Sequence, residues 1–196
     1  MFAAILDTCT LWPSLRRDVL LSFAAERIYR PLWSTTILEE LELCEIERLV
    51  GRGVERDTAE ERAQRLIEAM RTHFDDSEVE EAAYLPLEGR FGLPDANDEH
   101  VVAAAVVGGA GAIVTENLKH FPQDHLPFGT RAIHPNEFLF DAVQIDPIAA
   151  ARAIQQIADR SGRLGPQLTF DDVLEELRGR YGMDECVQLL EVGPRL

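Results

Sequence analysis

Short apolar runs alternate with helical patterns along the first two thirds of the chain. Residues 2–6 form a brief apolar run that ends at Asp7 and predicts a buried strand. Residues 29–33, 112–115 and 130–134 predict three more strands. Apolar residues recur at helical spacing in five further segments: 13–24, 36–50, 57–73, 98–106 and 135–143. This alternation predicts an α/β fold with a central parallel sheet flanked by helices in three layers.

The last quarter of the chain shows a helical pattern without strands. It predicts three helices, over residues 148–157, 168–181 and 184–190. From about Ile145 the pattern therefore predicts a separate helical part.

Two helix starts carry a recognisable capping signal. Thr35 or Thr36 is predicted as the N-cap of the helix that contains Glu40. Asp57-Thr58-Ala59-Glu60 resembles a capping box at the start of the next helix.

Polar residues at the edges of these apolar segments form four candidate sites. Asp7 follows the first strand, Glu40 lies in the helix after the second, Asp95 and Asp98 precede the helix near residue 100, and Thr115 to Asn117 follow a later strand. Ligands of parallel α/β sheets gather outside the carboxyl ends of the strands. These distant residues are therefore expected to converge on one point.

Converging carboxylates require a cation. Unpaired anions within a few ångströms raise one another's pKa unless a divalent metal neutralises them. Carboxylate and carbonyl oxygens suit the hard cations Mg²⁺ and Mn²⁺. The sequence therefore predicts a magnesium or manganese site, and metal-assisted phosphoryl chemistry as its use.

The four sites, in this order, resemble those of the PIN-domain ribonucleases, in particular the VapC-type toxins of bacterial toxin-antitoxin pairs. The resemblance covers roughly residues 1 to 140, and so implies a PIN-like nuclease domain over residues 1–140 and a helical C-terminal extension over residues 141–196. It is carried by four motifs: Leu6-Asp7-Thr8, Glu40-Leu41, Asp98 within Pro94-Asp95-Ala96-Asn97-Asp98, and Thr115-Glu116-Asn117-Leu118-Lys119-His120-Phe121-Pro122. Many relatives have Asp where this chain has Asn117, and the amide brings no negative charge.

The resemblance implies an endoribonuclease that hydrolyses RNA phosphodiester bonds with a metal-activated water and Mg²⁺ or Mn²⁺ as cofactor. Asp7, Glu40 and Asp98 would hold the metal with Asp95 beside it, Asn117 would complete the catalytic set, and Thr8 and Thr115 would position the substrate. The partners would be RNA, a small antitoxin protein and a second copy of the chain. Glu40 is preferred to Glu39 because neighbouring helix residues differ by about 100° in direction.

The charge of the chain argues against a broad nucleic-acid surface. Nineteen basic and 35 acidic residues give a net charge of −16, whereas nucleic-acid binding proteins usually carry a basic footprint. A local arginine surface is still a candidate for phosphate contacts, formed by Arg16, Arg17, Arg27, Arg30, Arg48 and Arg52. Asn117 and the acidic surface leave an alternative function, a binding module that kept the fold and lost activity.

Other sequence patterns bear on the location of the protein, the role of its cysteines and histidines, and other enzyme classes. No apolar run approaches the roughly 20 residues that span a bilayer, so a cytoplasmic protein is expected. Cys9, Cys44 and Cys186 are widely spaced, so each is expected to be a small buried hydrophobe. A zinc hydrolase is disfavoured because His-Glu-x-x-His is absent, and a haloacid-dehalogenase-like phosphatase would need an Asp where this chain has Cys9. His100 and His120 lie near predicted site residues and are expected to be surface or hydrogen-bonded histidines.

Overall fold

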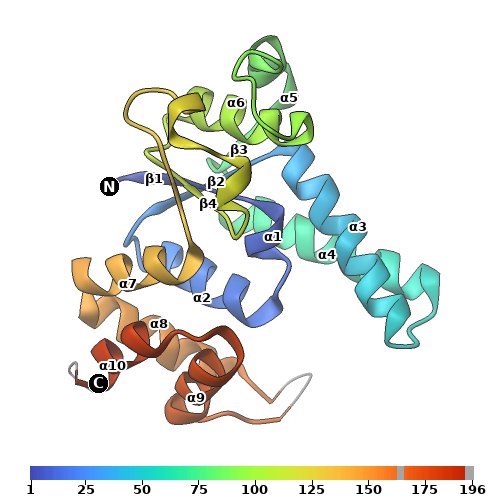
Figure 1. Ribbon diagram of the computed structural model, residues 1–196. Helices are drawn as coiled ribbons and strands as arrows, with labels where there is room; N and C mark the ends of the chain where they lie inside the picture. The colour runs from blue at the N-terminus through green and yellow to red at the C-terminus, as the bar shows by residue number, and fades with distance from the viewer. Residues whose placement is uncertain (163–165, 193–196) are drawn as a thin grey trace. The chain divides into compact units, whose positions relative to one another are not determined.

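A five-stranded sheet organises the chain in the computed structural model, which describes residues 1–162 and 166–192 (Figure 1). The strands follow the order β3-β2-β1-β4-β5 across the sheet, and the pairs β2–β3, β1–β4 and β4–β5 are parallel. Their bounds are β1 Ala3–Leu6, β2 Arg30–Ser34, β3 Glu78–Val79, β4 Ala112–Val114 and β5 Arg131–Ile133. The predicted fold class, a parallel α/β sheet with helices and a helical C-terminal region, is confirmed.

The helices agree with the predicted segments and add short ones between them. The α-helices are α1 Thr8–Leu11, α2 Ser14–Ala25, α3 Thr35–Gly51, α4 Arg56–His73, α5 Glu81–Tyr84, α6 Glu99–Gly108, α7 Pro135–Ile145, α8 Pro147–Arg160, α9 Phe170–Tyr181 and α10 Asp184–Val192. The 3₁₀ turns are η1 Leu85–Leu87, η2 Ala96–Asp98, η3 Leu118–His120 and η4 Gln123–His125. The sequence pattern had predicted neither α1 nor α5.

The two predicted capping signals are wrong. Helix α3 is capped by Ser34, whose hydroxyl accepts a hydrogen bond from the Ile37 N–H, one residue before the predicted Thr35. Helix α4 begins earlier than the capping-box pattern indicates, and the Glu55 carboxylate accepts from the Thr58 N–H. In both helices a side chain just upstream of the predicted cap accepts a hydrogen bond from a free N–H group of the first turn. Several neighbouring residues could accept this bond, and the sequence pattern does not distinguish between them.

Contacts divide the chain into two compact units, which are described separately. The sheet unit contains residues 2–12 and 31–133, and the other unit contains Met1, residues 13–30 and the chain from His134 onward. The domain boundary expected at residue 140 from the family resemblance stays a prediction.

The register of the sheet unit fixes where its strand ends lie. Leu6 at the end of β1 is paired with Val114 at the end of β4. Asp7 and Thr115 are the next residues of their strands, so both emerge at the same edge of the sheet. Helix α6 packs against β1, β3 and β4, and its residues from Val101 to Ala105 are buried. Asp98, the N-cap of α6, is thereby held by a helix that rests on the sheet.

Helices α3 and α4 form an antiparallel pair in the same unit (Figure 1). Ile46 and Leu49 on α3 pack against Ala59 and Ala63 on α4. The small alanines allow the two helices to approach closely. These contacts hold the C-terminal half of α3.

The second unit is helical. Helix α2 packs against α8, and α8 packs against α7 and α9. The rings of Tyr29 and Phe138 meet edge to face with centroids 4.8 Å apart, and the Arg16 guanidinium lies 4.9 Å from the centre of the Tyr181 ring. In the described part of the chain no helix is both long and apolar enough to span a bilayer.

Candidate functional site

Asp7 is a buried carboxylate at the end of β1, with 6% of its surface exposed. Its backbone N–H donates to the Val114 carbonyl, which continues the β1–β4 pairing. One carboxylate oxygen, Oδ2, accepts hydrogen bonds from the Thr115 hydroxyl at 2.6 Å and from the Cys9 thiol at 3.0 Å. Asp7 and Thr115, which are 108 residues apart in sequence, are therefore in direct contact, as the parallel strand ends predict.

The loop after β4 is connected to Asp7 through the Thr115 hydroxyl. The Thr115 hydroxyl accepts a hydrogen bond from the Asn117 backbone N–H at 3.0 Å while it donates to Asp7. Asn117 is thereby placed directly before the turn η3. The catalytic role that the family resemblance implies for its side chain stays a prediction.

Glu40 reaches the same region from α3. Its Oε2 atom accepts a hydrogen bond from the Thr8 hydroxyl at 2.5 Å, and its Oε1 atom lies 3.6 Å from Nε2 of His100. Burial raises the pKa of Glu40, but its contacts with His100 and Thr8 outweigh burial, so the pKa lies below its ordinary value. Glu39 is exposed, which agrees with the choice of Glu40 over Glu39.

The hydroxyls of Thr8 and Thr115 are both engaged by carboxylates. Thr8 donates to Glu40 and Thr115 donates to Asp7. In this structure the two threonines hold the acids, and the substrate-positioning role expected of them stays a prediction.

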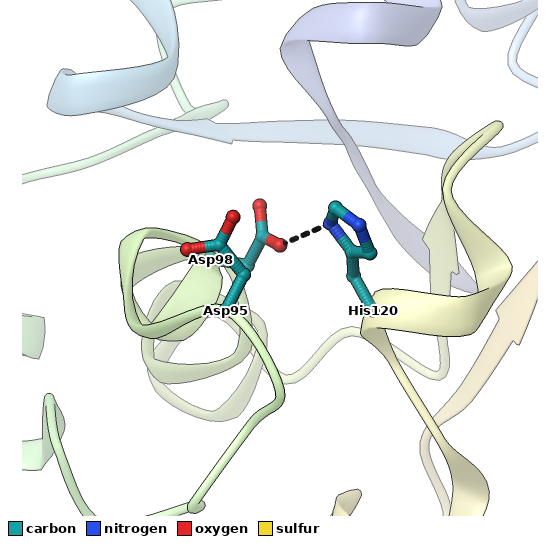
Figure 2. A group of neighbouring side chains, drawn as sticks. All are labelled: Asp95, Asp98 and His120. Carbon is teal, nitrogen blue, oxygen red and sulfur yellow. Dashed lines mark hydrogen bonds and ion pairs between the residues drawn. The ribbon is translucent and has the colours of Figure 1, made fainter.

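Asp95, Asp98 and His120 form a second group, shown in Figure 2. One ligand atom from each residue lies within 4.8 Å of the others. Asp95 caps the turn η2 by accepting from the Asn97 N–H at 3.0 Å, and Asp98 follows on the same segment. His120 faces them from η3, and its Nδ1 atom is 2.8 Å from Oδ2 of Asp98.

Electrostatics connect the two groups. Burial raises the pKa of Asp98, and the carboxylates of Asp7 and Asp95 raise it further. His120 acts in the opposite direction without cancelling the rise. The charge of Asp7 thus affects the pKa of Asp98, although the two residues are 91 positions apart in the sequence. A cation beside Asp98 would be stabilised, because it would offset the negative charges of Asp7 and Asp95 that raise the pKa of Asp98.

The donor atoms fit a divalent metal. The ligands predicted from the sequence are carboxylate oxygens from Asp7, Glu40, Asp95 and Asp98, the donors that Mg²⁺ and Mn²⁺ prefer. Of these, Asp95 and Asp98 belong to the group whose ligand atoms lie within 4.8 Å of one another, and Asp7 and Glu40 do not. His120 adds an imidazole nitrogen, which suits Mn²⁺ better than Mg²⁺. The sequence placed His100 and His120 near the site and expected surface or hydrogen-bonded histidines. Both are hydrogen-bonded, and each lies against a candidate ligand.

Cys9 is the site residue that the sequence pattern missed. The prediction that all three cysteines are buried hydrophobes holds for Cys186, but Cys44 is exposed and Cys9 is half-buried in polar surroundings. The Cys9 sulfur accepts from the Glu116 N–H at 3.3 Å. Burial and the neighbouring Asp7 charge raise the pKa of Cys9 to about 11, so the thiol stays protonated and can donate to Asp7. Its position two residues after Asp7 was the available signal.

The predicted arginine surface is wrong for at least two of its members. Arg16 and Arg17 are buried, with 5% and 8% of their surfaces exposed, so they are not available to a phosphate backbone. Arg48 is engaged by Glu45 on the same helix. The apolar pattern of α2 did not reveal that its arginines point inward.

Comparison with known proteins gives two matches. The model of the PIN domain family matches residues 3–119. A curated protein of Mycobacterium tuberculosis named "Putative ribonuclease VapC50" is 41% identical over 81 residues, which cover 41% of this chain and 47% of that protein. The match thus spans about half the length of this relative. No solved structure matches.

Proposed function

The chain belongs to the PIN domain family, and on this premise we propose that it is a metal-dependent endoribonuclease that acts as the toxin of a toxin-antitoxin pair. The observation that carries the proposal is the group of Asp95, Asp98 and His120, whose ligand atoms lie within 4.8 Å of one another, together with the electrostatic interaction between Asp7 and Asp98. These carboxylates come from two different strand and helix ends, and Asp7 raises the pKa of Asp98. An enzyme that gathers anions in this way needs a cation to act on a phosphodiester.

The proposed ligands are Asp7, Glu40 and Asp98, with Asp95 and His120 beside Asp98. When bound, Mg²⁺ or Mn²⁺ would acidify a water molecule and offset the charge that develops on the phosphate. The residues of the chain orient the ligands. Thr115 and Cys9 hydrogen-bond to Asp7, and Thr8 hydrogen-bonds to one oxygen of Glu40. Two of the three proposed carboxylate ligands are therefore oriented by the protein in the absence of metal.

Asn117 is proposed to position the attacking water or the phosphate through its amide. It brings no charge, so the site has one anion fewer than a four-acid site, and a second metal is expected to bind weakly. The same substitution, with the net charge of −16, favours the alternative that the chain is an inactive binding module.

RNA as substrate, an antitoxin as partner and a homodimer as the active form are proposed from the family. The name of the relative, "Putative ribonuclease VapC50", supports the first two. An acidic protein gains little from general attraction to RNA, because phosphate contacts depend on cationic side chains. We therefore propose that the site metal supplies much of the affinity for the scissile phosphate.

The decisive experiment incubates purified protein with end-labelled RNA in Mn²⁺, Mg²⁺ or EDTA. We expect cleavage with either metal and none in EDTA. Asp7→Asn should abolish cleavage, and Asp75→Asn, a change at an exposed acid, should not. Cleavage by a folded Asp7→Asn protein at the normal rate would contradict the metal assignment.

Two further outcomes separate the alternatives. Metal binding without RNA cleavage would favour the inactive module. Release of phosphate from small phosphate esters without RNA cleavage would favour a phosphatase. The toxin role is tested separately by expression in cells, where growth arrest should require Asp7 and should be relieved by co-expression of the protein encoded next to this chain.

A further inference from the structure

His100 occupies a buried position between two elements of the sheet unit. It lies in the first turn of α6 with 7% of its surface exposed. Its Nδ1 atom is 3.2 Å from the hydroxyl of Ser34, which is itself fully buried and caps α3. A histidine tied only to such a cap would be an ordinary core residue. The position of its other ring nitrogen, Nε2, indicates a further role.

The second ring nitrogen faces Glu40. Nε2 of His100 is 3.6 Å from Oε1 of Glu40, while the other oxygen of Glu40 is held by Thr8. The two carboxylate oxygens therefore each meet a different residue, one from α1 and one from α6. One oxygen is thereby held by a hydrogen bond, and the other lies within ion-pair distance of the His100 ring.

The hydrogen-bond roles can be assigned from the partners. A carboxylate only accepts hydrogen bonds, so the proton of a neutral His100 ring belongs on Nε2. The Ser34 hydroxyl accepts from the Ile37 N–H and can donate its own proton to Nδ1. Every group in the series Ile37, Ser34, His100 and Glu40 then has a complementary partner.

We propose that His100 is a positioning residue that aims the Glu40 carboxylate at the metal site by bracing it against the capped start of α3. The inference rests on the proposed metal-dependent function and adds to it a residue outside the ligand set. In this proposal His100 is not itself a ligand of the metal. It acts through Glu40, as residues that orient metal ligands do.

Two substitutions separate the two nitrogens of the ring. His100→Asn places an amide near the position of Nδ1 and keeps the contact with Ser34, but it cannot reach Glu40. His100→Gln extends an amide N–H toward the position of Nε2 and keeps the contact with Glu40. Both remove the ring, so a purely structural role predicts similar losses for both.

The measurement is Mn²⁺ affinity, determined by calorimetry and by the electron paramagnetic resonance signal of free Mn²⁺. We expect His100→Asn to bind Mn²⁺ about 10- to 100-fold more weakly, the usual loss when a partner of a metal ligand is removed. His100→Gln should recover most of this loss. His73→Asn, at an exposed histidine of α4, is the control and should match the wild type. Equal Mn²⁺ affinity in the Asn and Gln variants would overturn the proposal.

A double substitution tests whether His100 acts through Glu40. Glu40→Gln removes the charge to be positioned, so adding His100→Asn to it should weaken Mn²⁺ binding no further. An additional tenfold loss would show that His100 acts by another route and would overturn the proposal. If His100→Asn does not fold, Ser34→Ala provides the same test from the other end of the brace, with an expected loss of Mn²⁺ affinity that Glu40→Gln again abolishes.

The wild type distinguishes this inference from the proposed function. If wild-type protein binds no Mn²⁺ and cuts no RNA, the proposed function itself fails. If the wild type binds Mn²⁺ and the Asn variant binds it equally well, the function stands and the role of His100 fails.

Discussion

The two halves of the candidate site hold their carboxylates in opposite ways. In the braced half, formed by Asp7, Thr8, Glu40 and Thr115, each acid accepts hydrogen bonds from neighbouring side chains. In the crowded half, formed by Asp95, Asp98 and His120, acids lie beside other acids. The pKa of Glu40 is lowered, because hydrogen bonds outweigh burial, and that of Asp98 is raised by burial and by neighbouring carboxylates.

This difference assigns different physical tasks to the two halves. The braced half is oriented by the protein itself, so it contributes geometry that exists without a ligand. In the crowded half the carboxylates repel one another, and a bound cation would reduce this repulsion. In the proposed metal site, the crowded half would supply negative charge for the cation and the braced half would supply preoriented ligands.

Removing the charge of Asp98 gives the largest expected effect. Asp98→Asn should lower RNA cleavage and Mn²⁺ affinity by at least about 100-fold, the upper end of the losses known for residues that merely support a ligand. Because the substitution also removes repulsion from Asp7 and Asp95, the metal-free protein should unfold at the same or a higher temperature. Cleavage assays and thermal unfolding in EDTA measure the two effects. A strong destabilisation without metal would break the distinction between the halves.

The loop that carries Asp95 depends on a buried carboxylate next to the crowded half. Glu99 is 4% exposed and accepts hydrogen bonds from the N–H groups of Phe91 and Leu93, each at 3.0 Å. Glu99→Gln replaces two charge-assisted bonds by weaker ones and should cost about 2 kcal/mol of unfolding free energy at pH 7. Urea unfolding measures this cost, and the exposed Glu61→Gln should change it by less than about 0.5 kcal/mol.

The braced half is tested by removing the hydroxyl of Thr115. Thr115→Val keeps the shape but leaves the Asp7 carboxylate and the Asn117 N–H without this partner, at a cost of about 1–2 kcal/mol. RNA cleavage should fall along with stability, in contrast to the Asp98 variant, whose stability is maintained. Urea unfolding and cleavage assays of Thr115→Val and of the surface variant Thr72→Val provide the comparison. Unchanged stability would show that the brace is not formed by Thr115.

The sequence predicts most of the fold because its strands are short apolar runs with clear ends. The run before Asp7 and the run before Thr115 each gave a strand within one residue of the observed bounds. Strand β3 was missed because two residues, Glu78 and Val79, are too few to show an alternating pattern. The caps of α3 and α4 were misplaced because several adjacent side chains could accept the same N–H groups.

The site was predictable only where the sheet itself determines it. Asp7 and Thr115 meet because the ends of paired parallel strands coincide, which the alternation of elements already implies. The partners of His100, His120 and Cys9 depend on how α6, η3 and α1 are rotated against one another, and spacing along the chain carries no information on that. The buried arginines of α2 were missed for the same reason.

A carboxylate outside the proposed ligand set provides the reference for the smallest effect. Glu78 is held by Arg71 through two bonds of 2.7 and 2.9 Å, and this contact lowers the pKa of Glu78 despite partial burial. Because the folded pKa lies below the unfolded value of about 4.3, the ion pair contributes stability above that pH and loses it as the pH falls through the folded pKa. Glu78→Gln should therefore cost less than about 1 kcal/mol at pH 7. Urea unfolding at pH 7 and near pH 3 should show the difference from wild type shrinking in acid. A difference that persists in acid would mean that Glu78 stabilises the fold through packing, and it would then no longer serve as a reference for the held carboxylates of the braced half.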